Sequence, residues 1–248
     1  MKAPREPASI DRELRELAVE LAEGAGRMLL EASPTGQASK SSPTDLVTDA
    51  DRRAEEHIVG LLRRLRPDDS ILAEEGSVHE GSSGVRWVID PLDGTINFVY
   101  GIPHWCVSIG VEGLVWLGVV HDPNRGETFT DADRFRPSSK TDLSDALVGT
   151  GFSYSSQMRS HQARVLEKVL PLVRDVRRAG SCALDLAWVA CGRFDAFYED
   201  DTHHWDVSAG LAIIEAAGAR AETHGALTLA AGNEILFEKL SELVLGAR

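Results

Sequence analysis

Two aspartates at the end of an apolar stretch are the residues of this sequence best suited to binding a metal ion. Residues 87–89 read Trp-Val-Ile and predict a buried strand, and residues 90–95 then read Asp-Pro-Leu-Asp-Gly-Thr. The proline fixes one backbone dihedral and the glycine permits a close approach, so Asp90 and Asp93 can converge on one point. Carboxylates suit Mg²⁺, and the exposed amides of the turn suit phosphate oxygens.

A purely structural turn is the alternative, because Asp-Pro and Asp-Gly are common turn formers. Two further acidic segments favour a site. Residues 71–76 form a short apolar run that ends in Glu74 and Glu75, and Asp206 follows Trp205 at the mouth of a predicted helix. Acidic residues thus stand at the ends of three predicted elements, which is more than the formation of turns requires. The sequence therefore predicts a cation site beside an anion site.

These three motifs closely resemble those of the inositol monophosphatase family of Mg²⁺-dependent, lithium-sensitive phosphatases. The resemblance runs from about the first predicted helix to the last. It implies an α+β or α/β fold with layered α-β-α-β-α packing, in a single domain over residues 1–248. Approximate halves would be 1–135, with the metal-binding motifs, and 140–248, on the substrate side. The resemblance also implies a homodimer and two to three Mg²⁺ ions per active site.

The family's metal ligands fall on residues of these motifs. By resemblance, Glu74, Asp90 and the carbonyl of Leu92 would hold the first Mg²⁺, and Asp90, Asp93 and Asp206 the second. Glu74 would also reach a weaker third ion through water. The motifs contain no cysteine or histidine, and their carboxylates are needed as ligands. Direct attack by water is therefore favoured over a covalent intermediate.

The resemblance also implies catalytic residues. Thr95, paired with Asp51, and Glu75 would lie near the attacking water. Asp51 has an alternative role, because an acid at a helix N-terminus is stabilised by the helix dipole. Lys40 falls in a segment that matches the family's active-site lid and could neutralise phosphate charge. Lys40 could equally be an ordinary solvated side chain.

Substrate contacts are implied in the second half of the chain as well. The residues concerned are Asp93, Gly94, Thr95, Ser181, Cys182, Glu199 and Asp206. Among these, Glu199 would bind substrate hydroxyls, and Ser181 has the alternative role of a helix cap. The sequence departs from the family pattern at Ser208, where a small apolar residue is common, and at Cys182, where alanine is frequent. These departures leave the substrate range open.

Composition limits the function classes. The chain has 248 residues, 43% hydrophobic and 26% charged, which is long enough for one large domain or two modest ones. A net charge of −13 argues against nucleic-acid binding, which usually uses a basic face. No apolar run approaches the roughly 18 residues of a membrane span, and the N-terminus lacks a signal-peptide core. We therefore expect a cytoplasmic enzyme whose partner is a small phosphate ester, with no membrane contact. The cysteines are expected to be buried thiols.

Hydrophobic periodicity predicts the elements that position these residues. Helices are expected over 10–29 with Ser9 as cap, 51–66, 159–170 and 180–191, with a further helix from about residue 205. Strands are expected at 70–73, 86–90, 106–111, 114–120 with a tight turn at 112–113, 147–149, 172–177 and 194–199. Residues 200, 201, 203 and 204 are expected in a solvated loop, and His104 as a packed side chain.

Two other functions remain open at this point. Within the superfamily, the substrate could be fructose bisphosphate, a 3′-phosphoadenosine nucleotide or histidinol phosphate. From another class, the chain could be a metal-binding regulatory partner of other macromolecules, with its acidic surface as the interface. The complete ligand sets favour an enzyme.

Overall fold

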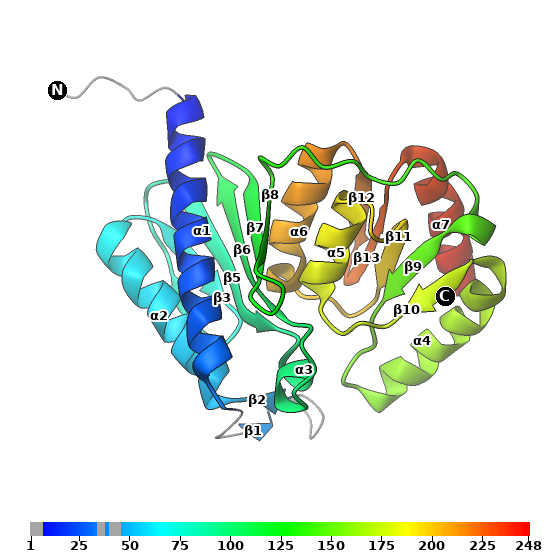
Figure 1. Ribbon diagram of the computed structural model, residues 1–248, viewed down its shortest axis with the longest axis horizontal. Helices are drawn as coiled ribbons and strands as arrows, with labels where there is room; N and C mark the ends of the chain where they lie inside the picture. The colour runs from blue at the N-terminus through cyan, green and yellow to red at the C-terminus, as the bar shows by residue number, and fades with distance from the viewer. Residues whose placement is uncertain (1–6, 34–37, 40–45) are drawn as a thin grey trace.

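Helices and sheets alternate in five layers (Figure 1). The structure is a computed structural model that describes residues 7–33, 38–39 and 46–248. Helices α1 (Pro7–Glu31) and α2 (Asp49–Leu65) cover one face of a six-stranded sheet, and α5 (Cys182–Ala190) and α6 (His204–Ala217) lie between the two sheets. Helices α4 (Ser156–Val169) and α7 (Glu234–Ala247) cover the outer face of a five-stranded sheet. This arrangement confirms the expected α-β-α-β-α layers.

The two sheets come from successive parts of the chain. The six-stranded sheet has the order β4-β3-β5-β6-β7-β8, and the other has the order β10-β9-β11-β13-β12. Strands of the first are β3 (Ser70–Ala73), β4 (Val78–His79), β5 (Val85–Asp93), β6 (Cys106–Gly113), β7 (Leu117–Asp122) and β8 (Glu127–Thr130). Strands of the second are β9 (Leu147–Thr150), β10 (Asp175–Arg177), β11 (Ala196–Glu199), β12 (Arg220–His224) and β13 (Leu227–Ala231). The exact division into halves stays a prediction.

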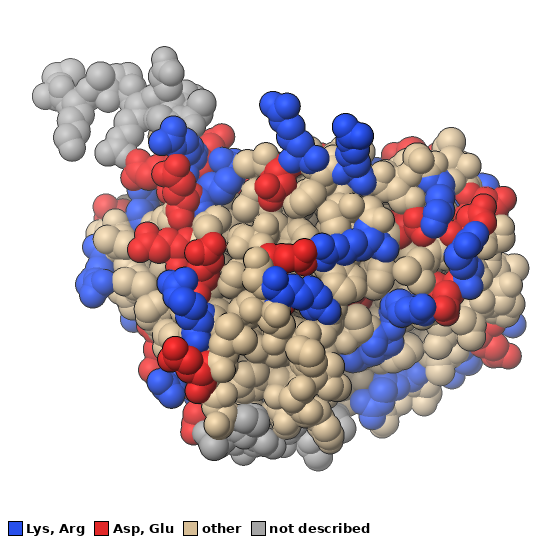
Figure 2. All heavy atoms as spheres, in the orientation of Figure 1, with Lys and Arg blue, Asp and Glu red and all other residues tan. Residues whose placement is uncertain are grey.

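Smaller elements complete the described chain. They are the paired strands β1 (Ala38–Ser39) and β2 (Leu46–Val47), the short helix α3 (Thr95–Val99), and the 3-10 turns η1 (Leu143–Asp145) and η2 (Leu170–Leu172). None of the described helices is long and apolar enough to span a membrane. Acidic and basic side chains are interspersed over the face shown in Figure 2. The net negative charge therefore does not form one continuous acidic patch on this face.

Successive side chains of β6 lie on opposite faces of the sheet and contribute to two different apolar clusters. Val107, Ile109 and Val111 pack with residues of α1 and α2, whereas Cys106 belongs to the cluster that includes α5 and α6. This is the two-residue period of a strand buried on both faces. A third cluster fills the space between the five-stranded sheet and α4 and α7. The site is therefore carried by a sheet that is covered on both sides.

Strand β5 extends further than its sequence predicts. We expected it to end at Asp90, but it continues to Asp93 through a register shift, in which Asp90 pairs with Ser108 and Asp93 with Cys106. Three residues on β5 thus advance against two on β6, which is a bulge. The proline between the aspartates lacks an amide hydrogen and is tolerated where the hydrogen-bond ladder is interrupted. Both aspartates consequently remain attached to the sheet.

Two predicted strand boundaries are wrong, one at the end of β6 and one at the start of β10. The expected turn at 112–113 is displaced to 114–116, because β6 continues through Gly113. Gly113 has φ +101° and lies so close to Gly84 that an added Cβ would be 2.0 Å from its carbonyl oxygen. The expected strand over 172–177 begins only at Asp175, because Leu172 is the last residue of η2 and residues 173–174 connect η2 to β10.

Three helices begin earlier than predicted. Helix α1 begins at Pro7, so the expected cap Ser9 lies inside it. Helix α2 begins at Asp49, and α4 begins at Ser156 instead of residue 159. The missed signals are local: Thr48 and Ser155 act as N-caps by accepting backbone hydrogen bonds through their side chains.

Two opposed glycines allow α6 to lie directly on the six-stranded sheet. Gly110 of β6 and Gly118 of β7 are register partners. A Cβ on Gly118 would lie 2.1 Å from the carbonyl oxygen of Ala209, and one on Gly110 would lie 2.1 Å from Oγ of Ser208. Both contacts are far inside van der Waals distance. The missing side chains therefore determine how close α6, and with it Asp206, approaches the sheet.

We predict that Gly118→Ala destabilises the protein by about 1–3 kcal/mol, the usual cost of overpacking a well-packed contact. The added methyl group would meet backbone, which cannot rotate away. Urea unfolding midpoints measure the change. Gly60→Ala is the matched control: Gly60 is an exposed position of α2 with nothing within 4 Å of an added Cβ, and should gain roughly 0.5–1 kcal/mol. Equal stability of Gly118→Ala and the original chain would contradict the proposed close contact.

Candidate functional site

A cavity of about 430 Å³ opens between the ends of β5 and β11 and the first turns of α5 and α6. Six carboxylates line it: Glu74, Asp90, Asp93, Glu199, Asp201 and Asp206. The sequence-predicted residues that line it are Glu74, Asp90, Leu92, Asp93, Gly94, Thr95, Ser181, Cys182, Glu199 and Asp206. Residues from both halves of the chain therefore meet at one place. Lys40, predicted in a lid, lies outside the described residues.

The carboxylates at the base of the cavity repel one another. Burial, followed by the charges of Glu74, Asp93 and Asp206, raises the pKa of Asp90 well above its ordinary value. Burial also raises the pKa of Asp93 to about 6, against hydrogen bonds from Ser181 and Ala183 that lower it. The pKa of Asp206 is likewise raised, chiefly by burial and then by Asp93 and Glu74, although the amide of His203 opposes the shift. A cluster of buried like charges of this kind is stabilised by a cation.

The carboxylates face a shared space without forming a closed coordination cage. Among the described residues, no three Asp, Glu, His or Cys side chains are grouped tightly enough to hold an ion as they stand. One oxygen of each aspartate is engaged by the protein: Asp90 Oδ1 accepts from the amide of Leu92 at 3.0 Å, and Asp206 Oδ2 from that of His203 at 2.7 Å. The donor set is composed of oxygens, which fits Mg²⁺.

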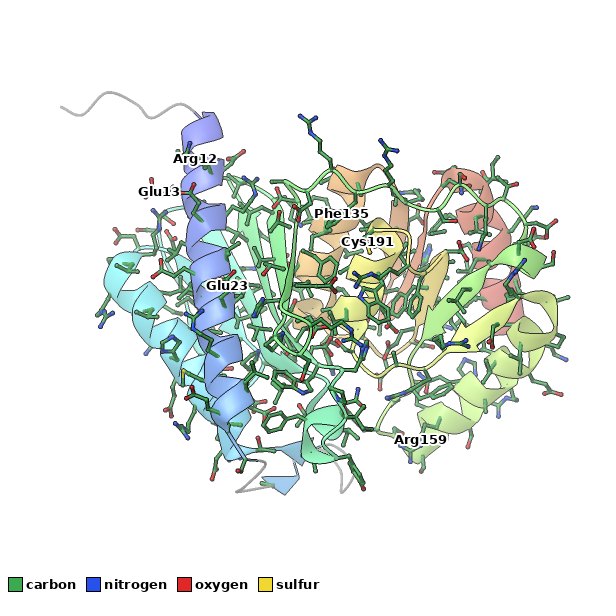
Figure 3. All side chains as sticks on the ribbon, in the orientation of Figure 1. Arg12, Glu13, Glu23, Phe135, Arg159 and Cys191 are labelled. Atoms are coloured by element: carbon green, nitrogen blue, oxygen red, sulfur yellow. The ribbon has the colours of Figure 1, made fainter. Side chains whose placement is uncertain are left out.

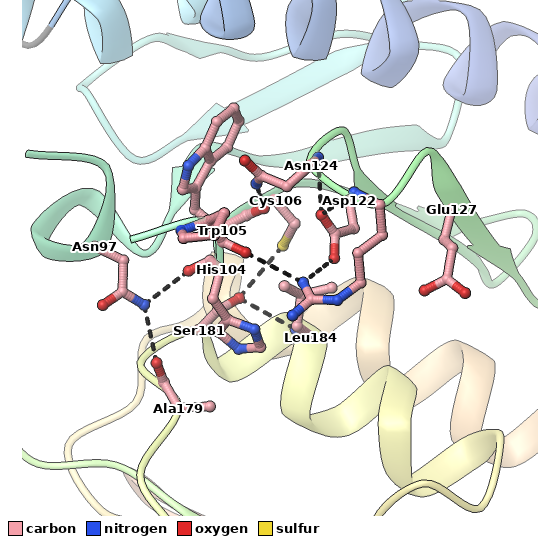
Figure 4. Close-up of polar contacts among 12 residues, drawn as sticks. Asn97, His104, Trp105, Cys106, Asp122, Asn124, Glu127, Ala179, Ser181 and Leu184 are labelled. Atoms are coloured by element: carbon pink, nitrogen blue, oxygen red, sulfur yellow. Dashed lines mark hydrogen bonds and ion pairs between the residues drawn. The ribbon is translucent and has the colours of Figure 1, made fainter. Parts of the chain in front are cut away.

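Asp93 joins the two halves of the molecule. Its Oδ2 accepts hydrogen bonds from Ser181 Oγ at 2.6 Å and from the amide of Ala183 at 2.7 Å, both in the first turn of α5. Ser181 is also the N-cap of α5, as predicted, because its Oγ accepts from the amide of Leu184 at 3.4 Å. Figure 4 shows Ser181 between Leu184 and the thiol of Cys106, which lies 3.5 Å from Ser181 Oγ. The sequence predicted the cap but not the bond of Ser181 to Asp93, and the substrate contact of Ser181 stays a prediction.

Thr95 and Asp51 form the predicted pair. Thr95 Oγ1 lies 2.9 Å from Asp51 Oδ1 and 3.1 Å from the carbonyl oxygen of Leu92. Asp51 is fully buried and occupies the third position of a capping box with Thr48, whose hydroxyl and amide both donate to Asp51 Oδ2. Burial raises the pKa of Asp51 in spite of these bonds. Asp51 therefore serves the start of α2 and the hydroxyl of Thr95 at the same time.

Glu74 lines the cavity, whereas Glu75 is not among the described residues that line it. The amide of Glu75 donates to Glu55 Oε2 at 2.6 Å, and the amide of Ser77 donates to Glu55 Oε1 at 3.0 Å. Sequence reasoning missed Glu55, which holds the turn after β3. The available signal was a glutamate four residues after Asp51 on the apolar face of α2, where Glu55 is buried.

Glu199 closes β11 at the far wall of the cavity. Burial raises its pKa to about 8, opposed by Arg178 and assisted by Asp93 and Asp201. Arg178 is the single Lys or Arg among the described residues lining the cavity, and the sequence offered no signal for it. A glycine at position 151 makes room for Glu199, because an added Cβ there would lie 2.0 Å from the glutamate carboxyl group.

Residues 151–155 form another wall that the sequence did not predict. Arg159, labelled on α4 in Figure 3, donates to the carbonyl oxygens of Ser153 and Tyr154 at 3.0 and 3.1 Å. Ser153 Oγ also donates to Asp201 Oδ2 at 2.5 Å. The expected solvated loop is confirmed for Asp200, Asp201 and His203, which lie between β11 and α6, whereas His204 is exposed but is already the first residue of α6.

His104 is packed, as predicted. Its ring lies 5.1 Å from that of Trp188 in an edge-on arrangement, and burial lowers its pKa to about 4. Figure 4 shows the carbonyl of His104 beside Asn97, whose Nδ2 donates to it at 2.7 Å and to the carbonyl of Ala179 at 2.9 Å. Asn97 thus forms a second link between α3 and the segment before α5. The expectation of buried thiols is confirmed for Cys106 and Cys182, whereas Cys191 is only partly buried.

Comparisons with known proteins identify the family that this chain resembles. A model of the inositol monophosphatase family matches residues 11–247. The inositol-1-monophosphatase SuhB of Mycobacterium tuberculosis is 46% identical over 202 residues, which cover 73% of this chain and 70% of that protein. The Nus factor SuhB of Xylella fastidiosa is 40% identical over 215 residues, which cover 81% of this chain and 78% of that protein.

Solved structures share the fold as well. The extragenic suppressor protein suhB from Bartonella henselae has a TM-score of 0.87 and 32% identity, with 94% of this chain and 98% of that chain covered. The family model spans almost the whole chain, and the relatives exceed 30% identity over most of their length. The chain therefore belongs to the inositol monophosphatase family, a family of phosphatases.

Proposed function

We propose that this chain is a Mg²⁺-dependent phosphomonoesterase that hydrolyses inositol monophosphate, or a related polyol or sugar phosphate, by direct attack of water. The observation that carries the proposal is the meeting of Glu74, Asp90, Asp93 and Asp206 in one cavity with hydroxyl and amide donors. Membership in the family supports phosphatase chemistry. Relatives that bear the name inositol-1-monophosphatase support the substrate class.

The residues that would hold two to three Mg²⁺ ions are Glu74, Asp90, Leu92 through its carbonyl, Asp93 and Asp206. Bound there, Mg²⁺ would offset phosphate charge and lower the pKa of water. Asp93 is anchored to α5 and Asp206 to the amide of His203, so each presents its other oxygen to the cavity from a fixed position. Fixed carboxylates reduce the rearrangement that binding requires.

Thr95 would orient the attacking water. The hydrogen on its Oγ1 has two acceptors, Asp51 Oδ1 and the carbonyl oxygen of Leu92. In either case a lone pair of Oγ1 remains to accept a hydrogen bond from water. Asp51 is itself held by Thr48, so it limits rotation of the threonine. The role of Glu75 near the water stays a prediction.

The substrate would lie between Thr95 and Glu199. The amides of Gly94 and Thr95 and the first turn of α5, with Ser181 and Cys182, line the same cavity and offer donors for phosphate oxygens. Glu199 lies on the wall formed by β11, where it can accept hydrogen bonds from polyol hydroxyls. Anchoring the polyol there would place its phosphate against the acidic base of the cavity.

A regulatory role is the second candidate function. It is favoured by the name Nus factor SuhB carried by the Xylella fastidiosa relative at 40% identity. Loss of phosphate release in a variant with unchanged regulatory effect would separate the two roles. Fructose bisphosphate, 3′-phosphoadenosine nucleotides and histidinol phosphate remain alternative substrates. A homodimer, implied by the resemblance, belongs to the same proposal and can be measured by light scattering.

We expect the purified chain to release phosphate from inositol monophosphate with Mg²⁺ and to stop when the metal is chelated. Asp93→Asn should lower kcat/KM by more than about a hundredfold, beyond the roughly 10–100-fold typical of residues outside the ligand shell. Asp145→Asn, which changes an exposed carboxylate outside the cavity, should leave activity unchanged. Absence of phosphate release across a panel of polyol and sugar phosphates would refute the proposed function.

Thr95→Ala should lower kcat and kcat/KM together, by about a hundredfold or more, because the hydroxyl would act mainly in the transition state. Thr95→Ser retains an oxygen that can bond to Asp51 and should recover most of the rate. Steady-state kinetics at saturating Mg²⁺ provide the measurement. A Thr95→Ala variant with the original kcat would remove both Thr95 and Asp51 from the mechanism.

Glu199→Gln should weaken hydrolysis of inositol monophosphate in a pH-dependent manner. Below its pKa of about 8, protonated Glu199 resembles glutamine, whereas above it the carboxylate is the stronger acceptor. The loss in kcat/KM should therefore grow with rising pH, to roughly ten- to a hundredfold. Nitrophenyl phosphate, which offers no hydroxyls, is the matched substrate and should be little affected. Equal losses on both substrates would show that Glu199 supports the metal site instead.

A further inference from the structure

The glutamate near the end of β6 holds the first turns of α6. Glu112 Oε1 accepts a hydrogen bond from Ser208 Oγ at 2.7 Å. Nε2 of His204 lies 2.9 Å from Oε1 and 3.1 Å from Oε2 of the same carboxylate. His204 and Ser208 are four residues apart and so lie on one face of the helix. One carboxylate therefore contacts two successive turns of α6.

Asp206 points away from this contact. At about 100° per residue, Asp206 is turned by roughly 160–200° from both His204 and Ser208 around the helix axis. Its side chain lines the catalytic cavity, and its Oδ2 accepts from the amide of His203. Glu112 consequently holds α6 from the side opposite to the cavity.

The surroundings of Glu112 suit a charged group. Its side chain is 24% exposed, and Arg86 on β5 is its register partner. Burial alone would raise the pKa of Glu112, but hydrogen bonds from His204 and Ser208 and the charges of His204 and Arg86 lower it on balance. A charged acceptor makes stronger hydrogen bonds than a neutral one. The surroundings therefore favour the charged carboxylate as the acceptor of both contacts with α6.

This contact adds a polar restraint to the apolar packing of α6. Gly110 and Gly118 set how closely α6 approaches the sheet, and Val207, Ala209 and Ile213 pack in the apolar cluster with α5. Glu112 opposes rotation and sliding of the helix, because either would lengthen its bonds to His204 or Ser208. Metal-binding and catalytic groups require placement within about 0.5 Å.

We propose that Glu112 is a positioning residue for Asp206, which it holds in the orientation for Mg²⁺ binding through His204 and Ser208. The inference rests on the proposed function in assuming that Asp206 is a metal ligand. It adds a residue outside the cavity, and it gives a purpose to Ser208, at which the sequence departs from the family pattern. Ser208 supplies the hydroxyl that a small apolar residue would lack.

The test is Mg²⁺ affinity, measured by calorimetric titration of the folded protein with the metal alone. Glu112→Ala should weaken binding roughly tenfold. This is at the lower end of the 10–100-fold typical of residues that hold a metal ligand in place without contacting the metal. Ser208→Ala removes one bond and should weaken binding by about threefold, since the second contact remains. Glu112→Gln keeps an oxygen acceptor for Ser208 and should recover most of the affinity. In kinetics, the Mg²⁺ concentration for half-maximal rate should rise more than kcat falls.

Glu222→Ala is the matched control. Glu222, on β12, likewise pairs with a histidine, His224, at 3.2 Å, and with Arg220. It should lower the melting temperature no more than Glu112→Ala does, because its partners lie on its own partly exposed strand, and it should leave Mg²⁺ affinity unchanged. A Glu112→Ala protein that loses stability but binds Mg²⁺ like the original chain would overturn the inference. If Glu112→Ala does not fold, Ser208→Ala decides by the same criterion.

Failure of the proposed function would be distinguishable from failure of this inference. A wild-type protein that binds Mg²⁺ but releases no phosphate would refute the enzyme, whereas the positioning role is decided by the Mg²⁺ affinities of the variants. Absence of Mg²⁺ binding to the wild type would overturn both.

Discussion

The carboxylate of Asp93 makes the contact on which the arrangement of the site depends. It is carried by the last residue of β5 and accepts hydrogen bonds from Ser181, 88 positions later in the chain, and from the amide of Ala183. A carboxylate is stabilised at a helix N-terminus by unpaired amides and by the helix dipole. One side chain therefore joins the six-stranded sheet to the helix layer and fixes the distance between two walls of the cavity.

The same cavity concentrates negative charge at buried positions, and burying that charge opposes folding. Asp90 and Asp206 have raised pKa values because they are buried near one another and near Glu74. The three apolar clusters that separate the layers must offset this cost, since the carboxylates cannot neutralise one another. Repulsion that opposes folding is also what favours a divalent cation. Function and stability thus place opposite demands on the same residues, as is common at active sites.

Placement of the carboxylates depends on a strand bulge, two glycines and a helix N-cap as much as on side-chain contacts to the carboxylates themselves. A bulge at 90–93 keeps both aspartates of β5 on the sheet, whereas a free turn would leave them mobile. Gly110 and Gly118 let α6 approach until its backbone touches the sheet. Thr48, in turn, holds Asp51 against Thr95 from the start of α2. Each of these features restricts one element, and together they hold residues from distant segments within a single cavity.

By itself, the sequence determined the elements whose signals are local. Apolar runs that end in acids located β3 and most of β5, and a serine before a helical segment located the start of α5. The resemblance of the motifs to a known family predicted the layered fold. It also predicted ten site residues that line the cavity in the structure. These signals lie within a few residues of the feature they predict, which is why they can be recognised without a structure.

Only the tertiary structure decided which distant residues support the site. Arg178, the wall at 151–155 and the contact of Glu112 with α6 have no local signature, because each depends on partners from other elements. The hairpin boundary at Gly113 was likewise decided by its contact with Gly84. From the sequence alone, a charged residue is predicted to be exposed to solvent unless its partner is known. The partner is known only when packing brings the two segments together. For this physical reason the supporting residues could not be predicted from the sequence, whereas the acidic motifs could.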